Sequence, residues 1–134
     1  GETPLFYASF HGHERIVTYL VESKANIEAK NINGTTPLFY ASGRGHERIV
    51  TYLVESKANI EAKNSFGETP LFYTSFHGHE RIVTYLVESK ANIEAKNSFG
   101  ETPLFYTSFH GHERIVTYLV ESKANIEAKN SFGE

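Results

Sequence analysis

The sequence has no cysteine, no methionine, no tryptophan and no aspartate. Without cysteine there is no disulfide framework, no thiolate nucleophile and no cysteine-ligated zinc site. Apolar runs are short: Thr18 interrupts the run from Ile16 to Val21, and none approaches the roughly 18 residues of a membrane span. No stretch at the start of the sequence resembles a signal peptide. These absences predict an intracellular, cytoplasmic protein with no membrane partner.

The sequence also lacks a large excess of charge of either sign, because 13 basic and 16 acidic side chains leave a formal charge of −3 over 134 residues. A nucleic-acid-binding surface needs a basic stripe, and nothing in the sequence supplies one. Leu, Ile, Val and Phe together make up about a quarter of the residues, which is enough apolar material for a core. We therefore expect a folded chain that binds no nucleic acid.

A repeat of 33 residues organises the whole sequence. Thr-Pro-Leu-Phe-Tyr begins at Thr3, Thr36, Thr69 and Thr102. The gapless copies span residues 1–33, 34–66, 67–99 and 100–132, and residues 133–134 begin a fifth. Units of this length stack, because no single unit can bury its own apolar face. The prediction is one continuous array over residues 1–134.

Each copy contains start and stop signals for two helices. Thr3 is a good N-cap, Pro4 suits the first helical position and Gly12 supplies a stop, so a short helix is expected between them. A second helix is expected over residues 14–22, where apolar residues recur at helical spacing. Glu14 lies at its start, where the helix dipole stabilises a negative charge. The segment over residues 24–33 predicts an extended loop or a hairpin that projects from the helix pair.

These motifs resemble the ankyrin repeat over the full length of the chain. Gly-x-Thr-Pro-Leu is followed by Ala8, Gly12-His13 matches the turn between the two helices, and Ala25-Asn26-Ile27 stands where the family usually has Ala-Asp-Val. The resemblance implies an all-α solenoid of helix-turn-helix units with projecting β-hairpin loops. It also implies a non-catalytic module that binds a protein partner in a concave groove lined by the first helices and the hairpin tips.

The copies depart from the family pattern at three places. Phe6 replaces the usual His, Asn replaces both usual Asp residues, and Lys24 replaces the usual Gly after the second helix. If the left-handed backbone conformation is kept at Lys24, the lysine costs roughly 1 kcal/mol there.

Only six of the 33 positions differ among the copies. Apart from an Ala/Thr position, all of them lie at the hairpin tip or at the end of the first helix, where this family binds partners. Several carry phenylalanine, and exposed aromatic residues are typical of interaction surfaces. The candidate partner-binding residues are Glu2, Phe10, His11, Asn33, Thr35, Gly43, Arg44, Phe66, Glu68, Phe76, His77, Phe99, Glu101, Phe109 and His110. Two other interpretations remain: unrestrained drift of surface positions, and phenylalanines that fold back onto neighbouring repeats.

Metal and catalytic chemistry are not predicted. Packed helices lie 8–10 Å apart, whereas ligands of one zinc ion must approach within roughly 3.5 Å, so the histidines at 33-residue intervals cannot share a metal. Within a copy, no carboxylate falls at ligand spacing from His11 and His13. Ser9 and Ser23 recur in every copy, and near-identical units offer no unique catalytic cleft. We expect no enzyme activity, no metal and no cofactor.

Two functions follow from the sequence. The first is a protein-binding scaffold whose partner remains unidentified. The alternative is a structural array, a fragment of a longer or engineered one, which stacks end to end. Arrays normally carry polar caps, whereas the first copy keeps Leu5 and Ile16 and the last copy keeps Leu104 and Ile115. We therefore expect uncapped ends and head-to-tail self-association.

Overall fold

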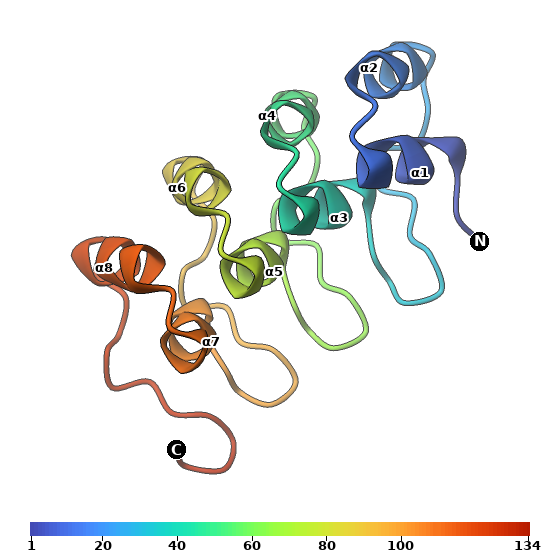
Figure 1. Cartoon of the computed structure of the whole chain (residues 1–134). Helices are drawn as coiled ribbons and strands as arrows, with labels where there is room; N and C mark the ends of the chain where they lie inside the picture. The colour runs from blue at the N-terminus through green and yellow to red at the C-terminus, as the bar shows by residue number, and fades with distance from the viewer.

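The computed structural model describes all 134 residues as a single stack of helix pairs, with the two termini at opposite ends (Figure 1). The first helix of each pair spans eight residues and the second spans nine. The helices are α1 (Pro4–His11), α2 (Glu14–Glu22), α3 (Pro37–Arg44), α4 (Glu47–Glu55), α5 (Pro70–His77), α6 (Glu80–Glu88), α7 (Pro103–His110) and α8 (Glu113–Glu121). The predicted all-α solenoid of helix-turn-helix units is confirmed.

The first helix of each pair begins and ends as its local sequence requires. In α5, the backbone N–H of Phe72 donates to Oγ1 of Thr69 at 3.3 Å, and Pro70 occupies the first helical position. Gly78 ends the helix with φ of 79°, a left-handed conformation that glycine adopts without steric cost. The other three first helices have the same caps.

The second helix of each pair ends in a Schellman motif, which satisfies two of its last carbonyl groups. In α4, the N–H of Lys57 donates to the carbonyl of Val54 at 3.0 Å, and the N–H of Ala58 donates to that of Leu53 at 2.9 Å. The left-handed residue is Lys57, with φ of 73°, so the lysine occupies the position that the family usually gives to glycine.

The loops between the pairs double back without forming β-strands. In the first loop, the N–H of Asn31 donates to the carbonyl of Thr35 at 3.1 Å, and the N–H of Gly34 donates to that of Asn31 at 3.0 Å. Oδ1 of Asn31 accepts from the N–H groups of Asn33 and Thr35. The asparagine side chain thus takes the donors that a strand ladder would use, which is why the implied β-hairpins are absent.

The core runs through the stack as one cluster of Leu, Ile, Val and Ala side chains contributed by all four pairs. The row formed by α1, α3, α5 and α7 packs more extensively along the stack than the row formed by the second helices. Small residues in the first helices, such as Ala41 and Ser42, allow this closer approach. The loops project from the side of these first helices (Figure 1). No helix in the structure combines the length and the apolar character needed to cross a bilayer.

Candidate partner-binding surface

The candidate residues fall into two rows. The helix row holds the last two residues of each first helix, namely Phe10, His11, Gly43, Arg44, Phe76, His77, Phe109 and His110. The loop row holds the turn residues Asn33, Phe66 and Phe99 and the loop exits Glu2, Thr35, Glu68 and Glu101. The structure therefore brings the candidates to the side of the stack from which the loops project (Figure 1).

Phenylalanines of the helix row pack against a tyrosine of the next repeat. The ring centroids of Phe10 and Tyr40 lie 5.2 Å apart, and those of Phe76 and Tyr106 also lie 5.2 Å apart. Phe109, which lies in the fourth repeat, is 78% exposed. We call the resulting surface the aromatic stripe, which consists of Phe10, Tyr40, Tyr73, Phe76, Tyr106 and Phe109.

Phe10 and Phe76 do fold partly onto neighbouring repeats, as one of the open interpretations had it, and they remain only half-buried. The tyrosines of the stripe were not among the candidates. Tyr40, Tyr73 and Tyr106 are identical in every copy, so comparing copies could not mark them. Their recurrence next to the varying phenylalanines, one helical turn away, was the available signal.

The stripe changes in the second repeat, where Gly43 stands in place of phenylalanine. A Cβ atom at Gly43 would lie 2.5 Å from Cδ1 of Tyr73, so the tyrosine ring occupies the space of the missing side chain. Tyr73 is stacked on Phe39, with centroids 4.5 Å apart and an interplanar angle of 25°. The equivalent angle between Tyr40 and Phe6 is 76°. The glycine has therefore allowed one tyrosine of the stripe to move inward.

A cavity of about 360 Å³ opens beside Gly43. We call it the notch; its lining residues are Phe10, Tyr40, Gly43, Arg44, Tyr73 and His77. The guanidinium carbon of Arg44 lies 4.5 Å from the centroid of the Phe10 ring, a cation–π contact. Arg44 is exposed and forms no ion pair, so its charge is available to a ligand.

The electrostatics of the notch leave Arg44 as its one cation at neutral pH. Burial lowers the pKa of His77 below its usual 6.5, and the nearby His79 and Arg44 lower it further. The imidazole of His77 is therefore neutral at pH 7. Burial raises the pKa of Tyr73 above its usual 10.0, which keeps its hydroxyl protonated.

In the loop row, the phenylalanines are accessible to solvent, and most of the loop-exit residues form hydrogen bonds within their own loops. Phe66 and Phe99 are about half exposed at the turns. The carboxylate of Glu68 accepts from Nδ2 of Asn64 at 2.8 Å, and the equivalent bond to Glu101 measures 2.9 Å. These glutamates brace their own loops, which reduces what they can offer a partner.

The prediction that Thr35 contacts a partner is wrong. Thr35 is 2% exposed, because it lies under the loop and its N–H donates to Oδ1 of Asn31. In later loops the residue equivalent to Thr35 is a glutamate whose carboxylate accepts from the asparagine of its own loop. Thr35 has no carboxylate, and Nδ2 of Asn31 donates to Glu2 at 3.4 Å. The second repeat therefore differs from the others at both ends of its first helix.

The turn histidines connect neighbouring repeats. Nε2–H of His46 donates to the carbonyl of Phe10 at 2.9 Å, and His79 and His112 make the same bond to the preceding repeat. The rings of His77 and His79 lie 6.4 Å apart at their centroids. No group of three or more potential metal-ligating side chains comes together anywhere in the structure.

Comparison with known families agrees with this architecture. The family described as ankyrin repeats (3 copies) matches residues 1–64 and 57–130. The chain belongs to the ankyrin-repeat family. No curated protein matches the chain significantly. Ankyrin repeats are generally protein-interaction modules.

Proposed function

We propose that this ankyrin array is a non-catalytic, intracellular scaffold that binds a protein partner along the aromatic stripe and the loop turns. The observation that carries the proposal is the notch, where the array departs from its own repeat and exposes a cation among aromatic rings. Gly43 makes room for the inward Tyr73, and the adjacent Arg44 adds an unpaired cation to the lining of the same cavity. Aromatic and arginine side chains are the residues that most often anchor interfaces.

The chemistry of the notch favours an acidic side chain of the partner. Arg44 supplies a planar donor fork that matches a carboxylate, and the neutral His77 does not compete with it. The rings of Phe10 and Tyr40 line the same cavity and accept the apolar stem of that side chain. Phe76 and Phe109 extend the stripe and are suited to apolar side chains further along the partner.

A selection from a random peptide library displayed on phage tests the assignment. The enriched peptides should carry Glu or Asp next to an aliphatic or aromatic residue. The paired change Gly43→Phe with Arg44→His gives the second repeat the residues of its neighbours, and it should abolish the acidic preference. Phe76→Ser with Phe109→Ser should reduce binding of the same peptides at least tenfold.

The control is Tyr19→Ser, because Tyr19 is exposed on α2 and lies outside the stripe and the notch. Tyr19→Ser should leave peptide binding unchanged. Full binding by the folded Phe76→Ser, Phe109→Ser protein would refute the stripe, and an unchanged acidic preference after filling the notch would refute the role of Arg44.

A second candidate function is end-to-end self-association, which one observation favours. Ile16 in the first repeat is 51% exposed, whereas its equivalents Ile49, Ile82 and Ile115 are at most 2% exposed. A capped array would carry a polar residue on this outer face, whereas this chain exposes an isoleucine that the other three repeats bury. Sedimentation over a hundredfold concentration range tests this function: the mean mass should rise with concentration, and a constant monomer mass would exclude it.

A further inference from the structure

We propose that a second copy of this chain seats its first repeat on the fourth repeat of another copy, in the register that joins neighbouring repeats within the chain. The inference rests on the end-to-end association proposed above and specifies its partner, its register and its direction. The same interface joins neighbouring repeats three times in the structure, and it leaves one open face on the first repeat and one on the fourth.

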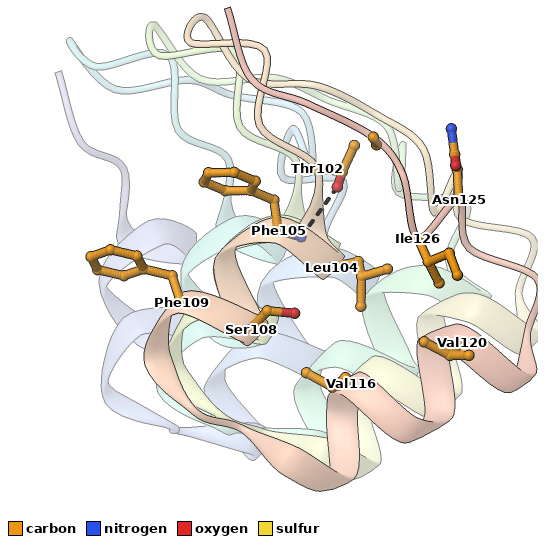
Figure 2. A pocket seen from close by; sticks show the side chains of 10 residues that line it. Thr102, Leu104, Phe105, Ser108, Phe109, Val116, Val120, Asn125 and Ile126 are labelled. Carbon is orange, nitrogen blue, oxygen red and sulfur yellow. Dashed lines mark hydrogen bonds between the residues drawn. The ribbon is translucent and has the colours of Figure 1, made fainter. Parts of the chain in front are cut away.

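The face at the end of the fourth repeat is an apolar groove of about 500 Å³ (Figure 2). Leu104 of α7, Val116 and Val120 of α8 and Ile126 of the last loop line it. In earlier repeats the following repeat covers the same positions. Val120 is 42% exposed and Ile126 is 67% exposed, whereas their equivalents in the inner repeats are only partly exposed and pack against the core.

The face at the start of the first repeat carries the side chains that fit this groove. Within the chain, Ile49 and Tyr52 of α4 meet Val17 and Thr18 of α2 at the junction of two repeats. The same junction recurs between α4 and α6. In the proposed register, Ile16 of the second copy is placed against Val116 of the first. Burial of Ile16 supplies apolar area to the contact.

An ion-pair ladder runs along the second helices and stops at both faces. Nη1 of Arg48 lies 3.8 Å from Oε2 of Glu14, and the two following steps of the ladder measure 3.9 and 3.7 Å. Arg15 has no preceding glutamate, and Glu113 has no following arginine. The unpaired members lie on opposite faces and have opposite charges.

Three hydrogen-bond ladders end in the same complementary way. Turn histidines donate to a carbonyl of the preceding repeat, which leaves His13 on the first face and the carbonyl of Phe109 on the last. Loop N–H groups donate at 2.7 to 2.9 Å to a glutamate of the preceding repeat. Turn N–H groups donate at 2.8 to 2.9 Å to a carbonyl of the preceding turn. These last two ladders leave the N–H groups of Asn26 and Ile32 on the first face and the acceptors of Glu127 and Phe132 on the last.

The distribution of these groups makes the contact directional. In these ladders the free donors lie on the face of the first repeat and the free acceptors lie on the face of the fourth. One longer ladder runs the other way, because Nζ of Lys30 and Nζ of Lys63 donate at 3.4 Å to the carbonyls of Lys63 and Lys96. Two first faces, or two fourth faces, would oppose donor to donor or acceptor to acceptor. The contact is therefore heterologous, and a heterologous contact that does not close produces an open chain of copies.

Blocking one face at a time gives a decisive experiment. Ile16→Glu places a carboxylate opposite the acceptors of the fourth repeat, and Val120→Lys places an ammonium group opposite the donors of the first. Each variant alone should sediment as a monomer. An equimolar mixture should form a dimer and nothing larger, because each variant keeps one open face of the complementary kind.

Controls keep the test interpretable. Glu88→Lys changes an exposed residue of α6 in the third repeat, away from both faces, and should associate like the parent chain. Circular dichroism checks that each variant is folded. If Ile16→Glu or Val120→Lys fails to fold, the exposed pair Arg15→Glu and Glu113→Arg replaces them. Each of these should lower the association constant severalfold in low-salt buffer, and mixing the two should restore it.

The outcomes separate the register from self-association itself. If the parent chain stays monomeric throughout the concentration range, both proposals fail. If the parent associates and the folded single-face variants still associate on their own, the register is wrong while self-association stands. A mixture that forms no dimer, or a charge-swapped mixture that shows no recovery, also overturns the register.

Discussion

Lys57 has a strained left-handed backbone conformation, and so does the equivalent lysine of every other copy. It lies in the Schellman motif after α4 with φ of 73°, and its equivalents Lys24, Lys90 and Lys123 have φ between 73° and 75°. For a residue with a Cβ atom, this conformation costs roughly 1–2 kcal/mol. We expect Lys57→Gly to raise the free energy of unfolding by about 1 kcal/mol. Glycine removes the backbone strain, and the larger conformational entropy of glycine in the unfolded chain offsets part of that gain. Urea denaturation measures this as a higher midpoint at a constant slope.

Lys57→Ala is the control for this prediction, since alanine removes the charge and keeps the Cβ atom. It should leave the midpoint close to that of the parent. If alanine stabilises the chain as much as glycine does, lysine charge and not backbone strain explains the effect.

The pKa of His77 makes stability depend on pH. Burial and the neighbouring cations lower this pKa in the folded state below the usual 6.5, so the unfolded chain binds the proton more readily. The contribution of neutral His77 is therefore complete above about pH 6.5 and is lost as the pH falls through and below that value. We expect the urea midpoint to drop between pH 7.5 and pH 5.5, and to drop less in His77→Gln. An equal drop in both proteins would contradict this assignment.

Individual residues also show where sequence reasoning stops. Comparing copies marked Gly43 and Arg44, because those residues vary and lie at the end of a first helix. It did not mark Tyr73, which is constant among the copies and is unusual only in its packing. It marked Thr35, which varies and is buried. Variation indicates where side chains differ, whereas exposure depends on contacts across repeats that no single copy contains.

At the scale of the element, the first helices depend on their threonine caps. The N–H of Phe72 donates to Thr69, which satisfies one of the donors that a helix start leaves free. Thr69→Ala removes that acceptor, so we expect the free energy of unfolding to fall by about 1 kcal/mol. Thr69→Ser keeps the hydroxyl and should recover most of the loss. Chemical denaturation of the three proteins under identical conditions checks this, and equal loss in both variants would indicate a packing effect of the threonine methyl group.

Helix bounds were predictable and loop structure was not. Thr3, Pro4 and Gly12 define the first helix through local chemistry, and the second helix runs from Glu14 to Glu22 as its apolar spacing predicts. The loop was expected as an extended loop or a hairpin, and its β-strands are absent because Asn31 bonds the backbone donors of its own turn. Competition between a side chain and a ladder depends on the final geometry of the loop, which residue types alone do not determine.

At the scale of the whole molecule, stability should depend on neighbouring repeats more than on local sequence. The second helices α2 and α6 have the same nine residues, yet Ile16 is 51% exposed and Ile82 is 1% exposed. The difference arises only from the repeat that precedes α6. In such an array the stability is a sum of repeat terms and interface terms, so identical substitutions at the two sites remove different amounts of interface.

We therefore expect Ile82→Ala to lower the free energy of unfolding by about 2–5 kcal/mol, the usual cost of a cavity in a packed core. Ile16→Ala, in the same local sequence, should cost less than about 1 kcal/mol, because Ile16 is still 51% exposed to water and has less apolar area to lose from burial. Both values come from urea denaturation at the same low protein concentration, at which end-to-end contacts are fewest. A similar cost at the two sites would mean that helix propensity and not the interface between repeats sets the stability, whereas a large difference assigns it to the junctions that also define the two open faces of the array.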